Sequence, residues 1–162
     1  MEMDGNTADH DLLGPIMTSY LAQMDSAMKI SKTISEHGNE EEISPDSLIT
    51  GLIYRLMVPM EDNEIKESLD EAKNILSITS SDEDLDDEFG KGRLECDIDT
   101  TDDNDKVIIN RVVKRNTCNC DLCIQCRVCL ANYHRHEIHG DKLAQIFKDA
   151  IDSACKIHNI SI

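Results

Sequence analysis

The sequence predicts a mainly α-helical protein. It is expected to consist of a small N-terminal helical bundle, an acidic linker, and a C-terminal Cys/His module that is stabilised by zinc and ends in a final helix. Three observations support this fold class. Apolar residues recur at helical spacing over residues 1–77, acidic residues crowd residues 78–105, and six of the seven cysteines fall within residues 106–162, five of them in the short stretch 118–129. We take these three ranges as the parts of the chain.

The first helix is predicted over residues 15–36. Pro15 suits the first position of a helix, and Gly38 is a plausible stop after its last turn. Apolar side chains follow one face of this segment at helical spacing, which usually marks the side of a helix that faces a core. These residues are Met17, Tyr20, Leu21, Met24, Ala27, Met28 and Ile34.

Two further helices complete the predicted bundle. Ser44 is a good N-terminal cap for a helix that Pro59 ends, and this is the most hydrophobic segment of the chain. Arg55 on this helix is expected to lie in solvent or to extend its charged end to water. A third helix is expected over residues 62–77, with acidic residues on its outer face. Short connections between the three helices indicate an antiparallel bundle.

The linker of residues 78–105 is predicted to be a flexible, solvated tether, because like charges repel and little apolar surface is present to bury. Cys96 lies alone within it and is left out of the candidate site. Residues 106–115 are β-branched and basic, which favours a short strand. Near the C-terminus, Asp141 is expected to cap a final amphipathic helix. Cys155 lies on this helix, and a packing or surface role is favoured for it over metal binding.

Charge is distributed unevenly along the chain. The net charge is -17, which argues against general nucleic-acid binding and against attraction to an anionic membrane. Residues 1–105 contain 28 acidic and 7 basic residues, whereas residues 106–162 contain 5 acidic and 9 basic residues. The two regions are therefore expected to attract each other. No secretory signal or membrane span is recognised, and crowded cysteines favour a reduced, intracellular protein.

The stretch from residue 118 to residue 139 carries the chemistry. It offers eight thiol or imidazole side chains, the number that two tetrahedral zinc sites require. Several neighbours are separated by two residues, and close pairs reduce the cost of ordering the ligands. The predicted metal ligands are Cys118, Cys120, Cys123, Cys126, Cys129, His134, His136 and His139.

Three groupings of these ligands are considered. In the first, Cys126-x2-Cys129-x4-His134-x4-His139 binds one zinc, and this spacing resembles a CCHC zinc knuckle whose last cysteine is replaced by histidine. The glycines and the aromatic residue of that knuckle are absent, so its nucleic-acid role is not carried over. In the second, a turn with two cysteines meets two histidines before the final helix, which resembles a treble-clef arrangement. The paired residues of this second grouping are Cys120 with Cys123 and His136 with His139. In the third grouping, all eight residues bind two zinc ions.

A different metal centre or none at all is also compatible with the sequence. The repeat of cysteines every third residue from Cys120 to Cys129 is similar to the C-x2-C-x2-C run of bacterial-type ferredoxins, although the closing x3-C-P is missing. Without metal, these residues would be reduced cysteines that behave as small apolar side chains in a helix.

The sequence favours a non-enzymatic zinc-binding protein that acts in protein–protein interaction, in regulation or as a subunit of a larger assembly. No phosphate-binding glycine loop and no nucleophile elbow is present, and cysteine-rich coordination favours structural zinc. The alternatives are an iron–sulfur or thiol redox protein and a zinc-dependent nucleic-acid-binding protein. The abundance of Ile, Asn and Asp adds one further hypothesis, a viral accessory or virion protein.

Overall fold

The computed structural model of the chain describes residues 8–81 and 110–162. The prediction of a mainly helical fold, with a cysteine-rich segment before a final helix, is confirmed. The elements of the described residues are the helices α1 Ala8–His37, α2 Pro45–Met57, α3 Asp62–Ser81, α4 Asp121–Asn132 and α5 Lys142–Ile157, the short 3-10 helix η1 Tyr133–Arg135, and the strands β1 Arg111–Val112 and β2 Ile160–Ser161.

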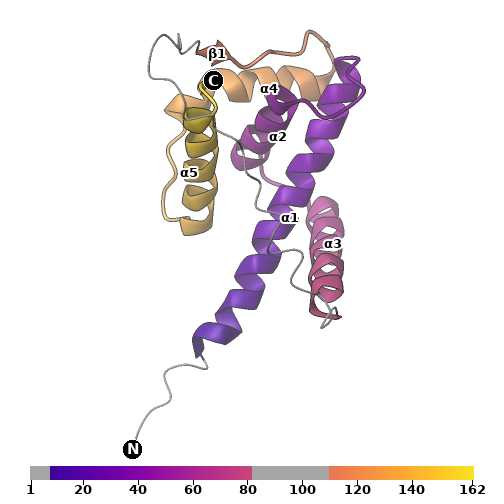
Figure 1. Cartoon of the computed structure of the whole chain (residues 1–162), viewed down its shortest axis with the longest axis vertical. Coiled ribbons are helices and arrows are strands. Elements are labelled where there is room, and N and C mark those ends of the chain that lie inside the picture. The colour runs from indigo at the N-terminus through magenta and orange to yellow at the C-terminus, as the bar shows by residue number, and fades with distance from the viewer. Residues whose placement is uncertain (1–7, 82–109) are drawn as a thin grey trace, which may run out of the picture.

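Helix α1 is the long element against which α2 and α3 pack (Figure 1). It begins at Ala8, so Pro15 lies inside the helix and the predicted start at Pro15 is wrong. Proline removes one backbone hydrogen bond but keeps a helical φ, so the helix continues through it. None of the helices in the described part of the chain is both long enough and apolar enough to cross a bilayer.

Helix α2 starts as the sequence predicts. The backbone N–H of Ser47 donates to the side-chain oxygen of Ser44 at 3.2 Å, and Pro45 occupies the first turn. The helix lies very close to α1 at Gly51, because a Cβ atom at Gly51 would lie 2.7 Å from the carbonyl oxygen of Ala27 and would overlap Ser31 Oγ. Glycine is therefore required where α1 and α2 pack together.

Arg55 on α2 is buried, with 3% of its surface exposed, so the expectation that it lies in solvent is wrong. Its guanidinium donates to Ser26 Oγ at 2.8 Å and to the carbonyl oxygen of Val58 at 2.6 Å. It also lies 3.5 Å from the Glu64 carboxylate on α3. These acceptors replace the water that the charge would otherwise need, and they connect α2 to both neighbouring helices.

One hydrophobic core joins the N-terminal helices to the C-terminal segment. Ile49 and Ile53 on α2 pack with residues of α4, η1 and α5. The C-terminal members of this core are Val113, Cys129, Leu130, Tyr133, Phe147, Ile151 and Cys155. The three-part division of the chain stays a prediction, because α3 continues to Ser81 and residues 82–109, including Cys96, lie outside the described residues.

The segment that leads to α4 is held at the start of α2. The predicted strand over residues 106–115 is reduced to β1, which pairs in parallel with β2, and residues 106–109 lie outside the described residues. The buried carboxylate of Asp46 accepts hydrogen bonds from the Arg111 guanidinium at 2.8 Å and from the backbone N–H of Lys114 at 2.6 Å. The final helix α5 begins as predicted, since the Asp141 side chain accepts from the backbone N–H of Ala144.

Replacement of Gly51 by alanine tests the close packing of α1 and α2. The added methyl group would meet the Ala27 carbonyl and the Ser31 side chain, so Gly51→Ala is expected to lower the free energy of unfolding by about 1–3 kcal/mol. Denaturant unfolding measures the change. Lys66→Ala, on the exposed face of α3, is the control and should change stability by less than ~0.5 kcal/mol. Equal stability of G51A and wild type would contradict this account of the packing.

Candidate metal centre

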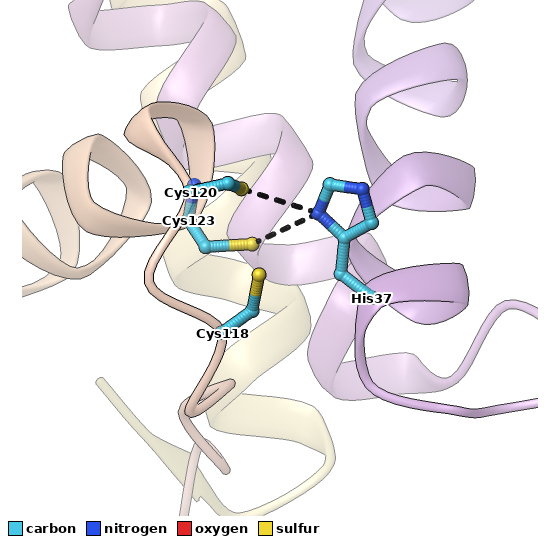
Figure 2. A group of neighbouring side chains, drawn as sticks. All are labelled: His37, Cys118, Cys120 and Cys123. Carbon is cyan, nitrogen blue, oxygen red and sulfur yellow. Dashed lines mark hydrogen bonds between the residues drawn. The ribbon is translucent and has the colours of Figure 1, made fainter.

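Four side chains from distant parts of the chain form a compact cluster. They are His37, Cys118, Cys120 and Cys123, and the ligand atoms that they offer all lie within 4.8 Å of one another (Figure 2). The Nδ1 atom of His37 lies 3.3 Å from Cys120 Sγ and 3.4 Å from Cys123 Sγ. One imidazole and three thiols are therefore close enough to bind a single metal ion.

The end of α1 places His37 in the cluster. His37 is the last residue of the helix, and the chain turns away directly after it. Asn39 adopts a left-handed conformation with φ of 55°, the backbone N–H of Glu40 donates to Ser35 O at 2.9 Å, and that of Asn39 donates to Glu36 O at 3.1 Å. This pair of bonds is the Schellman motif that ends many helices. It ends the helix directly after His37, whose ring faces the cysteine loop (Figure 2).

The start of α4 places the three cysteines. Cys120 is the N-terminal cap of the helix, and its Sγ accepts a hydrogen bond from the backbone N–H of Cys123 at 3.4 Å. Cys123 lies in the first turn, and Cys118 lies on the loop just before the helix. The positive end of the α4 dipole faces these sulfur atoms, so thiolates are favoured there.

The side chains of Asn116 and Arg127 form hydrogen bonds that fix the backbone of the cysteine loop. The Asn116 amide nitrogen donates to Ile34 O on α1 at 3.0 Å, and its amide oxygen accepts from the backbone N–H of Cys118 at 2.8 Å. Arg127 on α4 donates to the carbonyl oxygens of Asn116 and Cys118 at 2.7 and 2.6 Å. These contacts orient the loop toward the end of α1.

The thiols of the cluster differ in acidity. The hydrogen bond from the Cys123 backbone N–H lowers the pKa of Cys120 to about 7, with smaller contributions from the neighbouring thiols and His37. Burial raises the pKa of Cys123 to about 12. Burial also raises the pKa of Cys126, which lies one turn further along α4, to about 12. In the metal-free protein, Cys120 is therefore the thiol with the greatest thiolate character of these three.

Three of the eight ligands predicted from the sequence lie in this cluster, and the other five lie elsewhere. Cys126 and Cys129 point into the hydrophobic core on the inner face of α4. The Nε2 atom of His134 lies 3.3 Å from Ile162 O. His136 is half-buried just after η1, and His139 is 82% exposed beside Glu137. The treble-clef-like grouping paired Cys120 and Cys123 with two histidines. The two cysteines do lie together, but their neighbours in the cluster are His37 and Cys118.

His37 is the member of the cluster that the sequence did not reveal. It lies 83 residues before Cys120, on a helix whose apolar stripe indicated only packing. The one local signal is its position beside Gly38, where the helix ends and a side chain can point along the helix axis. Three histidines lie much nearer to the cysteines in sequence, so proximity in sequence favoured His134, His136 and His139, none of which belongs to this cluster.

Comparisons with family models, with curated proteins and with solved structures gave no match to this chain.

The acidity of Cys120 gives a testable difference in reactivity. In the metal-free, reduced protein, the rate of alkylation of Cys120 by iodoacetamide is expected to rise with an inflection near pH 7, because its pKa is about 7. Cys126 should remain unmodified over the same range, since it is buried and its pKa is about 12. Mass spectrometry of the alkylated peptides measures both rates. Faster labelling of Cys126 than of Cys120 would contradict the arrangement.

Proposed function

We propose that this chain is a non-enzymatic, intracellular zinc-binding protein that acts in protein–protein interaction, in regulation or as a subunit of a larger assembly. The observation that supports this proposal best is the convergence of His37 with Cys118, Cys120 and Cys123. Thiolate and imidazole are the ligands that zinc prefers, and Cys3His is a common structural set. Zinc needs these thiols reduced, which is consistent with an intracellular protein.

The spacing of the four ligand atoms fits zinc. In a tetrahedral site with ordinary zinc–sulfur and zinc–nitrogen bonds, a nitrogen and a sulfur ligand are about 3.5 Å apart. The distances of 3.3 and 3.4 Å from His37 Nδ1 to Cys120 Sγ and Cys123 Sγ are close to that value. The His37 nitrogen and these two sulfur atoms therefore need little movement to bind one ion, and all four ligand atoms lie within 4.8 Å of one another.

The ligand set supports a structural role for the zinc. Four protein ligands complete a tetrahedron, whereas catalytic zinc sites usually keep one position for water or substrate. A catalytic zinc also needs a general base close by, and the cluster contains no carboxylate. The proposal is accordingly a non-enzymatic protein.

The proposed zinc site joins two parts of the chain. His37 ends the first helix of the N-terminal bundle, and the three cysteines lie in the segment that leads into α4. An ion at this point closes a loop of more than 80 residues, so it restricts the unfolded chain and its binding energy contributes directly to folding. Metal binding would thus control how the C-terminal module is held against the bundle.

The alternatives receive less support from the geometry. An iron–sulfur cluster bound by the ferredoxin-like cysteine run would need Cys126 and Cys129, whose side chains pack in the core instead. Nucleic-acid binding is disfavoured by the net charge of -17. Protein partners are favoured by large apolar side chains that lie in solvent. Leu13 and Ile16 on α1 are 55% and 52% exposed, where the helix extends beyond its neighbours (Figure 1).

Measurement of the metal content tests the proposal. Protein purified under reducing conditions is expected to contain one zinc ion per chain by elemental analysis and to lack the visible absorption of an iron–sulfur cluster. His37→Ala and Cys123→Ser should each lose the ion or bind it at least ~100-fold more weakly, because one of four ligands is missing. A competing chelator of known affinity measures the change.

His139→Ala is the matched control for His37→Ala. His139 was predicted as a ligand from the sequence, yet it is 82% exposed and lies outside the cluster. H139A is therefore expected to retain one zinc ion per chain with unchanged affinity. Loss of zinc from H139A with retention by H37A would refute the site.

The residue that orients the cysteine loop gives a second test. Asn116→Ala removes the hydrogen bonds to Ile34 O, to the backbone N–H of Cys118 and to the Cys123 sulfur without removing a ligand. Zinc affinity is expected to fall about 10–100-fold, as is typical when residues that orient metal ligands are lost. Chelator competition at constant pH measures this, with Asn132→Ala at the far end of α4 as the control. An unchanged affinity of N116A would show that Asn116 does not organise the site.

A further inference from the structure

We propose that this metal centre is sensitive to oxidation: a peroxide joins Cys120 and Cys123 in a disulfide, and the zinc ion is released. The inference rests on the proposed zinc site and names its regulation. Three features support it. The two sulfur atoms lie close together, Cys120 is accessible to solvent, and the other contacts between α1 and the α4 segment include a small apolar cluster and the hydrogen bond from Asn116.

The positions of Cys120 and Cys123 suit a disulfide. The two residues occupy the cap and the first turn of α4, and residues three apart on a helix have Cβ atoms about 5–6 Å apart, roughly 1–2 Å more than across a disulfide. Their Sγ atoms belong to a cluster whose members lie within 4.8 Å, and both point toward the His37 ring (Figure 2). A small closure of the first turn would bring the sulfurs into bonding distance.

Access to solvent distinguishes Cys118 and Cys120 from the other described cysteines. Both are half-buried, whereas Cys123 is 1% exposed. Cys126 and Cys129 face the core and lie outside the cluster. A small oxidant therefore reaches Cys118 and Cys120 before the buried thiols, and Cys123, in the first turn of the helix that Cys120 caps, is positioned to attack an oxidised Cys120 sulfur.

The chemistry balances with one molecule of hydrogen peroxide. The Cys120 thiolate attacks one peroxide oxygen, the O–O bond breaks, and a sulfenic acid and hydroxide form. The Cys123 thiolate then attacks the Cys120 sulfur, an S–S bond forms, and a second hydroxide leaves. Two protons convert the hydroxides to water. The two thiolates together lose two electrons, which reduce the peroxide.

Oxidation would weaken the contact between the end of α1 and the loop that leads into α4. Only His37 and Cys118 would remain as ligands, and two ligands do not retain zinc. The contacts left between these elements in the described structure include a small apolar cluster centred on Ile30, Ile34 and Cys126 and the hydrogen bond from Asn116 to Ile34 O. Oxidation would thus separate the end of α1 from the cysteine loop without disturbing the larger core.

The experiment uses the full-length, zinc-loaded chain. Hydrogen peroxide is added at one to five equivalents, released zinc is followed with a chromogenic chelator, and the thiols are then alkylated and mapped by mass spectrometry. The expected result is the release of one zinc ion per chain together with a Cys120–Cys123 disulfide. Treatment with a reductant and fresh zinc should restore the original metal content.

Cys120→His provides a second measurement, because histidine can replace the ligand but cannot form the disulfide. The zinc-loaded C120H variant is expected to release the ion at least about tenfold more slowly than wild type under the same peroxide. If C120H binds no zinc, the disulfide map of the wild-type chain decides alone. Retention of zinc by the oxidised wild-type chain, or a disulfide between another pair, would overturn the inference but leave the zinc site intact. A reduced chain that binds no zinc would refute both.

Discussion

The contact between the end of α1 and the loop before α4 is the interaction on which the candidate metal centre depends. One imidazole from the first helix meets three thiols from the C-terminal segment, with all four ligand atoms within 4.8 Å. A common cation would stabilise this close approach, because it offsets the mutual repulsion of the sulfur ligands when they bind as thiolates. The proposed zinc ion would supply that charge and make a long-range contact part of the fold.

Polar contacts prepare the site from both sides. Asn116 connects the cysteine loop to the backbone of α1, and Arg127 fixes the carbonyl groups of the same loop. Further along, the Asp46 carboxylate holds the segment that leads to the loop against the start of α2. Together these bonds position the cysteine loop at the end of α1.

The same geometry connects stability to chemical reactivity. Sulfur atoms that share a zinc ion are close enough to form a disulfide, so a site that stabilises the chain under reducing conditions can be dismantled by an oxidant. The position of Cys120 at the start of α4 would serve both proposed roles, since a backbone N–H that stabilises its thiolate also raises the fraction of thiolate available to attack a peroxide. Cys126 and Cys129, one and two turns along, are removed from this chemistry because they pack in the core.

The sequence by itself determined what depends on neighbouring residues. Helical periodicity predicted α1, α2, α3 and α5, Ser44 and Asp141 predicted two helix starts, and the crowding of cysteines between Cys118 and Cys129 predicted a metal site in that stretch. Only the tertiary structure decided the fourth member of the cluster, because His37 reaches it from 83 residues away through the packing of α1. Tertiary packing likewise buried Arg55 and turned Cys126 and Cys129 inward. Local patterns encode helices and close ligand pairs, whereas the orientation of a helix face depends on which distant elements pack against it.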